Sequence, residues 1–396
     1  MDIRDDANAM LGDLVALRRE LHQIPEVGLQ IPRTQERVLS ALQGLPLEIT
    51  TGAETTSITG VLRGAEPGPT VLLRGDMDAL PVTEKVTSDF ASSNGNMHAC
   101  GHDLHTSMLV GAARLLSQHR DRLAGDVLFM FQPGEEGHDG AGVMLAEGLL
   151  ETTGVVPAAA YALHVAPALL PSGFFASKPG PVMASADSLK VVVRGRGGHG
   201  STPHMALDPI PAACEMVLAL QTFVTRTFSV FDPVVLTVGM LHAGTAVNVI
   251  SDEATFEATI RTTSATARDR VLEESVRVVR GIAAAHGCEV DVDVLRQFPV
   301  TVNHLEKNEL IAQRVRELHG EHRYFEMPNP TMGSEDFSKV LELVPGAMVI
   351  LGASPAGADP ATAAYSHSPF AEFDDSVLAD GAALYADLAL AELVQA

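Results

Sequence analysis

Four short segments of the chain carry side chains that commonly bind metal ions in proteins. They are Asp76-Met77-Asp78, Cys100-Gly101-His102, Glu135-Glu136 and His164. Thiolate, imidazole and carboxylate groups together suit zinc, and also cobalt, nickel or manganese. Each segment alone is weak evidence, because a Cys-x-His pair is often incidental and adjacent glutamates usually face solvent. A single site that joins all four is much stronger evidence.

The predicted secondary structure brings these segments to one edge of a sheet. Buried strands are predicted at 70–73, 127–131 and 159–163. Each strand leads into one of the segments, with Asp76, Glu135 and His164 just beyond the strand ends. The Cys100 segment precedes a helix predicted at 104–116. Binding sites in open α/β sheets form beyond the carboxyl ends of the strands, so this placement predicts a metal site.

The number of candidate ligands indicates two ions rather than one. A single ion takes three or four protein ligands, and the four segments offer more than that. Two ions about 3.5–4 Å apart polarise a carbonyl oxygen and generate hydroxide at neutral pH. A free carboxylate nearby then carries a proton from water to the leaving group. The adjacent pair Glu135-Glu136 supplies both functions, one side chain for a metal ion and the other for the proton.

The length and the net charge of the chain limit the classes of protein to which it can belong. The chain has 396 residues, which favours two compact units, and its 50 acidic against 27 basic residues give a net charge of −23. That charge disfavours nucleic acid and anionic membranes as partners. No stretch predicts a membrane span, and the acidic N-terminus is unlike a secretory signal. The three cysteines are too widely spaced for a disulfide framework, so a cytoplasmic location is expected.

The predicted fold is an α/β domain, with a mostly parallel sheet flanked by helices, interrupted by a smaller domain. Residues 186–298 follow the order strand, helix, strand, strand, helix, strand, which is the ferredoxin-like α+β pattern. Residues 1–185 and 299–396 are then the two parts of the catalytic domain. In addition to the elements named above, helices and strands are predicted at 6–23, 141–150, 188–194, 209–224, 234–240, 254–261, 267–286, 289–295, 347–351 and 374–393.

Three motifs also resemble those of a known family, the metallo-aminoacylases. That family includes hippurate hydrolase, plant auxin–amino acid conjugate hydrolases and N-acyl-amino acid amidohydrolases. The motifs are Asp76-Met77-Asp78-Ala79-Leu80-Pro81, Met97-His98-Ala99-Cys100-Gly101-His102-Asp103 and Gln132-Pro133-Gly134-Glu135-Glu136-Gly137. The resemblance runs from Leu21 to Pro369, nearly the whole chain. It implies a two-metal hydrolase that cleaves N-acyl amino acids into a carboxylate and a free amino acid.

The resemblance also implies roles for single residues. The implied metal ligands are Cys100, His102, Glu136, His164 and His367. Glu135 becomes the general base that activates a metal-bound water, and then the acid that protonates the leaving amine. Asp78 is expected to orient a ligand histidine. Asp103 and His105 could act in the same way or could face solvent. His367 is predicted by the resemblance alone, because a histidine in a Ser/Pro-rich loop carries no signal of its own.

The smaller domain carries a further motif at 197–204 that resembles a family motif. In relatives, the histidine that matches His199 faces the partner subunit's active site and helps to stabilise the tetrahedral oxyanion. Asn248 matches an asparagine assigned to substrate contact, although a turn asparagine at a strand end is an equal alternative. The resemblance thus implies a homodimer or higher homo-oligomer through an inserted lid or dimerisation domain. That domain could instead serve dimerisation alone.

Other activities of the same site stay open. A dipeptidase or an N-carbamoyl amino acid hydrolase would use the same residues, whereas N-acetyl and N-benzoyl amino acids are the first candidate substrates. A metal-stabilised binding protein without turnover would have no need of a free carboxylate such as Glu135. The expected cofactor is two divalent transition-metal ions per subunit, zinc or else manganese, cobalt or nickel. Cys214 and Cys288 lie in apolar settings and are predicted to pack in the interior.

Overall fold

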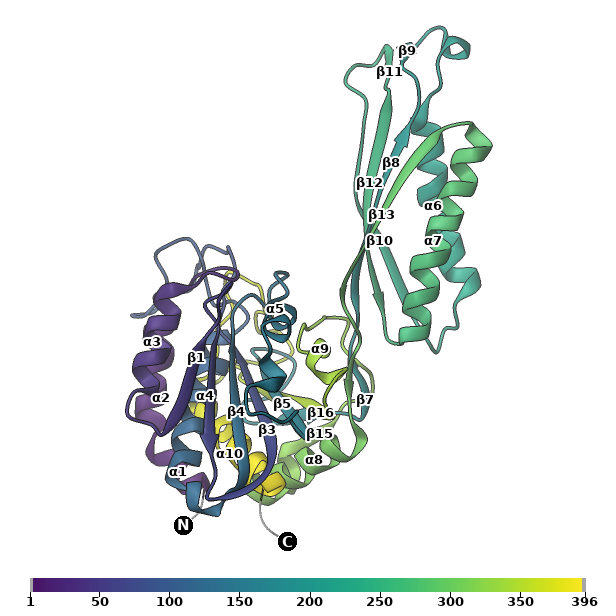
Figure 1. Cartoon of the computed structure of the whole chain (residues 1–396). Helices are drawn as coiled ribbons and strands as arrows, with labels where there is room; N and C mark the ends of the chain where they lie inside the picture. The colour runs from purple at the N-terminus through teal and green to yellow at the C-terminus, as the bar shows by residue number, and fades with distance from the viewer. Residues whose placement is uncertain (1–2, 394–396) are drawn as a thin grey trace. The chain divides into compact units, whose positions relative to one another are not determined.

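The computed structural model describes residues 3–393, which divide into two compact units (Figure 1). The first unit comprises residues 3–182, 302–329 and 336–393, and the second comprises 183–301 and 330–335. The second unit is therefore an insertion into the first. The chain crosses between the two units at 182–183, 301–302, 329–330 and 335–336.

The first unit is built on an eight-stranded sheet. Its strand order is β1 (Leu47–Thr51), β2 (Ile58–Arg63), β4 (Ala124–Gln132), β3 (Glu66–Asp76), β5 (Ala159–Ala166), β16 (Gly346–Gly352), β6 (Phe175–Ser177) and β15 (Tyr324–Glu326). The central strands β4, β3, β5 and β16 run parallel, while β1 and β2 pair antiparallel at one side. Parallel strands covered on both faces are apolar along their length, which explains the continuous apolar runs of the sequence. The predicted mostly parallel sheet is confirmed.

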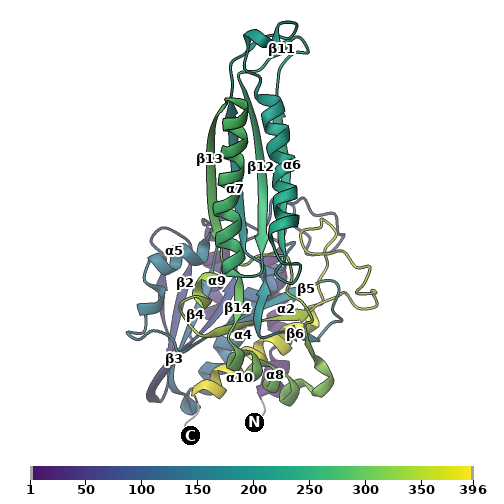
Figure 2. The same ribbon diagram turned by 90° about the vertical axis from the view of Figure 1, so that its right-hand side faces the viewer.

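Helices cover both faces of this sheet (Figures 1 and 2). They are α1 (Ile3–Ala9), α2 (Leu11–His22), α3 (Pro32–Leu42), α4 (His102–Gln118), α5 (Gly140–Ala146), α8 (Leu305–His319), α9 (Ser338–Leu341) and α10 (Leu378–Leu393). Helices α4 and α10 pack side by side on one face, and α5 lies on the other. Gly381 of α10 permits this close packing, because a Cβ there would lie 2.0 Å from Sδ of Met108 on α4.

Three of the predicted helices are divided in the structure. The helix predicted at 6–23 breaks at Met10, which separates α1 from α2. The helix predicted at 141–150 ends at Ala146, and a short 3-10 turn follows Gly148, whose φ of +89° belongs to the left-handed region that ends helices. The closing helix, predicted at 374–393, starts with a 3-10 turn at Asp375–Val377 before α10. Helices α3, α8 and α9 were not predicted.

The second unit has the predicted ferredoxin-like order. Its elements are β8 (Ala186–Arg194), α6 (Pro209–Thr227), β10 (Val234–Ala243), β12 (Glu253–Thr262), α7 (Ala265–His286) and β13 (Glu289–Phe298). The strands form an antiparallel sheet in the order β10, β12, β8, β13. Helices α6 and α7 lie side by side on one face of this sheet, where they enclose a core of their own (Figure 2).

The two cysteines of the second unit have different settings. Cys288 is buried, as predicted, but Cys214 is exposed, so the prediction that it packs in the interior is wrong. Helix α6 buries Ala213, Met216 and Leu220 at helical spacing, and this face leaves Cys214 on the outer side.

Four short strands form two further ribbons. β7 (Gly180–Met183) pairs with β14 (Thr301–Asn303), and β9 (Gly198–His199) pairs with β11 (Val249–Ile250). Among the helices formed by residues 3–393, none combines the length and the apolar composition needed to span a bilayer.

Candidate metal centre

The segments predicted to bind metal meet at one edge of the large sheet. Asp76 of β3 pairs in register with Gln132 of β4, so the segments that follow these parallel strands start at the same level. His164 lies near the end of β5, the other neighbour of β3. Helix α4 begins at His102, and the Cys100 loop before it lies at the same edge. The carboxyl ends of parallel strands thus bring together segments that are far apart in the sequence.

Gly101 lets the Cys100 loop approach β5 closely. Its φ is +83°, in the left-handed region that favours glycine. A Cβ at this position would lie 2.4 Å from Cγ2 of Val165 and 2.8 Å from Cε1 of Phe373. Any larger residue would push the loop away, so Gly101 determines where Cys100 and His102 lie.

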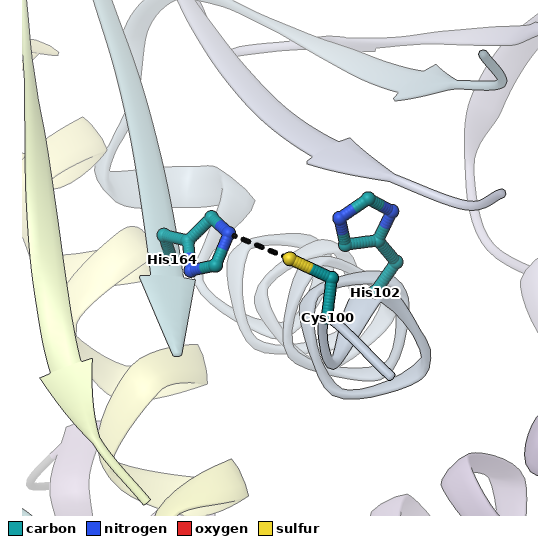
Figure 3. Close-up of side chains that lie close together, drawn as sticks. All are labelled: Cys100, His102 and His164. Atoms are coloured by element: carbon teal, nitrogen blue, oxygen red, sulfur yellow. Dashed lines mark hydrogen bonds between the residues drawn. The ribbon is translucent and has the colours of Figure 1, made fainter. Parts of the chain in front are cut away.

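Cys100, His102 and His164 form a first group of candidate ligands. One potential ligand atom of each residue lies within 4.8 Å of those of the other two. Figure 3 shows Sγ of Cys100 pointing at the ring of His164, and Sγ lies 3.4 Å from Nε2. Nδ1 of His164 donates to the carbonyl oxygen of Val165 at 2.7 Å, which leaves Nε2 for a ligand. A thiolate and two imidazoles are a common donor set for zinc.

A second group joins Cys100 to Glu136 and His367. Its potential ligand atoms also lie within 4.8 Å of one another, and Nε2 of His367 is 3.1 Å from Oε1 of Glu136. The backbone of His367 has a φ of +70°, which is rare for a residue with a side chain. Its N–H donates to the carbonyl oxygen of Ala99 at 2.9 Å, which helps to hold this conformation. Strained backbone of this kind gathers at functional sites.

The residues present fit a pair of metal ions. The two groups share the sulfur of Cys100, so a thiolate is available to both. Both ring nitrogens of His102 are buried, and within residues 3–393 neither makes a hydrogen bond of normal geometry. Buried ring nitrogens without a hydrogen bond of normal geometry are uncommon, and a bound cation is one explanation for them. The donor chemistry and the poorly hydrogen-bonded ring of His102, whose nitrogens lie 3.3 Å from Asp78 and 3.6 Å from Asp76, therefore point to the same conclusion.

The electrostatics of the two groups favour a deprotonated sulfur. Burial alone would raise the pKa of Cys100, but the neighbouring ring of His164 and other hydrogen-bonding groups lower it to about 5. Burial lowers the pKa of His164, yet the Cys100 thiolate outweighs this effect and raises it to about 9. Hydrogen bonds to Cys100 and Glu136 raise the pKa of His367 to about 10. The thiolate is the form of cysteine that binds metals.

Asp78 connects one ligand histidine to the acidic pair. Its Oδ1 accepts from the backbone N–H of Glu135 and its Oδ2 from that of Glu136, each at 3.1 Å. Oδ1 also lies 3.3 Å from Nδ1 of His102. A single buried carboxylate thus touches both the histidine and the loop with the two glutamates, which is the geometry that an orienting residue requires.

Asp103 and His105 do not face solvent, so that alternative is wrong for both. Nδ1 of His105 lies 2.5 Å from Oδ1 of Asp76, and its Nε2 accepts from the N–H of Val165 at 2.7 Å. Asp103 lies 2.9 Å from Nε of Arg18, a buried ion pair at the start of α4. Both residues follow His102 within one helical turn, and their contacts anchor the first turn of that helix.

A buried arginine that pairs with Asp76 was not predicted from the sequence. Arg74 is fully buried, and its guanidinium pairs with Asp76 at 2.5 Å and with Asp336 at 3.2 Å. The available signal was a charged residue at the end of an apolar strand, since an arginine there must have acidic partners. No local pattern marks Asp336 as one of them.

His199 and Asn248 lie together in the second unit. His199 of β9 pairs with Val249 of β11, and the N–H of Gly200 donates to the carbonyl oxygen of Asn248 at 2.8 Å. Nδ1 of His199 accepts from the N–H of Ser201 at 3.1 Å. When the ring is neutral, its proton therefore lies on Nε2, and because the residue is exposed this N–H can donate a hydrogen bond.

The chain matches the peptidase family M20/M25/M40 over residues 72–391. This chain belongs to that family. N-acetylcysteine deacetylase of Bacillus subtilis is 35% identical to this M20 chain over 379 residues, which cover 95% of this chain and 96% of that protein. IAA-amino acid hydrolase ILR1-like 2 of Arabidopsis thaliana is 36% identical over 382 residues, or 95% of this chain and 84% of that protein. The resemblance to metallo-aminoacylases is confirmed, and so is the prediction of a metal-dependent amidohydrolase.

A solved structure agrees with the fold. The YXEP protein of Bacillus subtilis, described as a dinuclear metal binding peptidase from the M20 family, is 33% identical and has a TM-score of 0.83. The similarity covers 98% of this chain and 99% of that one. Together with the two ligand groups, family membership supports divalent metal ions as cofactors of this M20 enzyme.

Proposed function

We propose that this M20 enzyme hydrolyses the amide bond of N-acyl amino acids and releases a carboxylate and a free amino acid. One observation carries the proposal: Glu135 is buried beside Glu136, and one of its carboxylate oxygens lies within 4.8 Å of a ring nitrogen of His102. A hydrolase needs a carboxylate that can hold a proton next to its metal ligands, whereas a binding protein does not. The relatives named as a deacetylase and an amino acid hydrolase support this substrate class.

Five side chains are proposed to hold two divalent transition-metal ions. They are Cys100, His102, Glu136, His164 and His367. The shared sulfur of the two ligand groups supports a pair of ions, and the mixed donors suit zinc or else manganese, cobalt or nickel. When bound, such ions would polarise the acyl carbonyl and lower the pKa of water.

Glu135 is proposed to carry one proton through both halves of the reaction. It takes the proton from the attacking water while the new carbon–oxygen bond forms. It then gives the proton to the amide nitrogen while the carbon–nitrogen bond breaks, so that an acid and an amine leave. Asp78 binds the backbone N–H groups of Glu135 and Glu136, which keeps the proton carrier and the ligand in a fixed relation.

The second unit is proposed to act in the site of a partner subunit, in a homodimer or larger homo-oligomer. Nε2 of His199 is free to donate to the oxyanion that forms during attack, because Nδ1 is already engaged by Ser201. Asn248 lies in the adjoining ribbon and is proposed to contact the substrate. The enzyme is proposed to work in the cytoplasm, in line with its acidic composition and scattered cysteines.

A dipeptidase or an N-carbamoyl amino acid hydrolase is the second candidate. Each cleaves an amide next to an amino acid, and the same ligands and the same Glu135 would serve. The description of the YXEP protein as a peptidase favours peptide cleavage as the first of these to test. Parallel assays with an N-acetyl amino acid, the N-benzoyl compound hippurate, a dipeptide and an N-carbamoyl amino acid distinguish the candidates by kcat/KM.

Metal analysis combined with one substitution tests the mechanism. We expect two ions per chain, and Glu135→Gln should keep both ions while turnover falls by about 10² to 10⁴. The glutamine has the size of the glutamate but cannot hold a proton. Near-normal turnover of Glu135→Gln with both ions bound would show that Glu135 is not the proton carrier.

A further inference from the structure

The loop at 133–140, which connects β4 to α5 and includes the first residue of α5, carries both glutamates of the site. One carboxylate binds both of its ends. Nε2 of Gln132, the last residue of β4, donates to Oδ1 and Oδ2 of Asp336 at 2.7 Å each. The backbone N–H of Ala141, in the first turn of α5, donates to Oδ2 of Asp336 at 3.0 Å. Asp336 therefore joins the residues that come just before and just after the loop.

Asp336 is itself held in place by further contacts. It is fully buried, and Nη2 of the equally buried Arg74 lies 3.2 Å from its Oδ1. Nε of Arg74 also donates to Oε1 of Gln132 at 2.9 Å. A carboxylate in the protein interior needs such a charged and hydrogen-bonded surrounding to remain ionised. The three side chains thus fix one another.

The buried network of Arg74, Gln132 and Asp336 lies close to two groups of the proposed site. A carboxylate oxygen of Asp336 lies within 4.8 Å of one of Glu135. On the other side, Arg74 pairs with Asp76, whose Oδ2 is 3.6 Å from Nε2 of His102. The network is therefore adjacent both to the proposed proton carrier and to a proposed ligand.

A second contact holds the same loop from the surface. Nζ of Lys339 lies 2.6 Å from Oδ2 of Asp139, and the Lys339 side chain is 25% exposed. Asp139 caps α5 by accepting from the N–H of Gly142 at 3.2 Å, and its own φ is +59°. Lys339 follows Asp336 by three residues, so one segment of the chain binds the loop at two places.

We propose that Asp336 is a positioning residue for the hydrolysis, and that Lys339 assists it. By joining the ends of the 133–140 loop, Asp336 sets the place of the Glu135 carboxylate relative to the ligands. The loop contains glycines at 134, 137 and 140, so without this constraint its conformational freedom increases, although the hydrogen bonds of Asp78 to Glu135 and Glu136 still hold its middle. The inference rests on the proposed function, because it assumes that Glu135 carries the proton. A displacement of about 1 Å in such a group can cost about a hundredfold in rate.

Asp336→Asn tests the buried contact. Both oxygens of Asp336 accept from N–H groups, so an amide nitrogen in place of either would face a donor and release one end of the loop. We expect kcat to fall by about tenfold to a hundredfold, with KM and metal content close to those of the wild type. The matched control is Asp387→Asn, which removes a nearly buried carboxylate that pairs with Arg314 and joins α8 to α10. It should lower the melting temperature and leave kcat unchanged.

A pair of Lys339 variants tests the surface contact. Because the Lys339 side chain is partly exposed, neither variant is expected to disturb folding. Lys339→Met keeps the length of the side chain and removes its pairing with Asp139, so kcat should fall several-fold. Lys339→Arg keeps the charge and should restore the activity. Such rescue by the conservative variant is not expected if Lys339 affects only solubility or expression.

Two results overturn the positioning role. One is wild-type kcat in both Asp336→Asn and Lys339→Met, and the other is an equal loss of kcat in Asp387→Asn. If Asp336→Asn does not fold, the kcat values of Lys339→Met and Lys339→Arg test the positioning role instead, and wild-type kcat in Lys339→Met then overturns it. Glu135→Gln is measured in parallel. If Glu135→Gln retains turnover, the proposed function fails. If Glu135→Gln loses turnover while Asp336→Asn and Lys339→Met keep wild-type kcat, only the positioning role fails.

Discussion

Sγ of Cys100 lies 3.4 Å from Nε2 of His164, and each group stabilises the charged form of the other. The imidazole holds the pKa of Cys100 at about 5, and the thiolate holds that of His164 at about 9. At neutral pH the metal-free protein therefore contains a thiolate beside an imidazolium. A metal ion binds the thiolate and the neutral imidazole, so its entry must remove the proton of His164 but none from Cys100.

Metal binding at pH 7 is expected to release about three protons per chain, one each from His102, His164 and His367. The pKa values of His164 and His367 are raised to about 9 and about 10, and nearby acidic groups raise that of His102 well above its ordinary value despite its burial, so all three rings are protonated at pH 7 in the metal-free enzyme. The apparent affinity should therefore rise with pH until the pH passes these values. Calorimetric titration in two buffers of different ionisation enthalpy measures the protons released. A value near zero at pH 7 would contradict this account of the site.

The metal-free enzyme is expected to lose activity in oxidant faster than the metal-loaded enzyme. Cys100 is a thiolate at neutral pH, and thiolates react with peroxide much faster than thiols do. A bound metal ion would occupy the lone pairs of the Cys100 sulfur and so slow its reaction with peroxide. The measurement is recovery of activity after peroxide treatment and metal readdition, in a Cys214→Ser background because Cys214 is exposed. Equal rates with and without metal would count against Cys100 as a ligand.

Asp78→Asn is expected to weaken metal binding by about 10- to 100-fold and to lower kcat. The NH2 group of the amide would face the backbone N–H of either Glu135 or Glu136, both of which now donate to Asp78, so one of these two hydrogen bonds would be lost. Competition with a fluorescent chelator measures the affinity. Asp126→Asn is the control, since Asp126 lies on β4 and pairs with Arg63 near the surface. Unchanged affinity in Asp78→Asn would exclude the orienting role.

His199→Ala is expected to lower kcat by about 10² to 10³ while the protein stays folded, because the ring is proposed to donate to the oxyanion. Steady-state kinetics and the oligomeric state are measured together. The control is His204→Ala, which removes another exposed histidine from the same loop. If the second unit serves only dimerisation, His199→Ala will turn over as fast as His204→Ala.

The sequence by itself determined the strands that build the site and the edge at which they end. Buried parallel strands are continuous apolar runs, and their carboxyl ends share one edge of the sheet, so placement at strand ends and in the loop before a helix predicted that Cys100, His102, Glu136 and His164 lie together. His367 was found only through the resemblance. Its place depends on a φ of +70° and on a hydrogen bond to Ala99, neither of which a Ser/Pro-rich loop reveals.

Only the tertiary structure decided which distant residues hold these groups in place. The sequence allows Arg74 to be recognised as a buried charge that needs an acidic partner. It does not indicate that Asp336 is one of these partners. Gln132 and Asp336 are 204 residues apart in the chain, and a hydrogen bond between them leaves no mark in the local pattern of either. Apolar periodicity is a property of neighbouring residues, whereas the pairing of buried polar groups depends on the packing of the whole unit. That difference explains why the strands were predicted and the network around Asp336 was not.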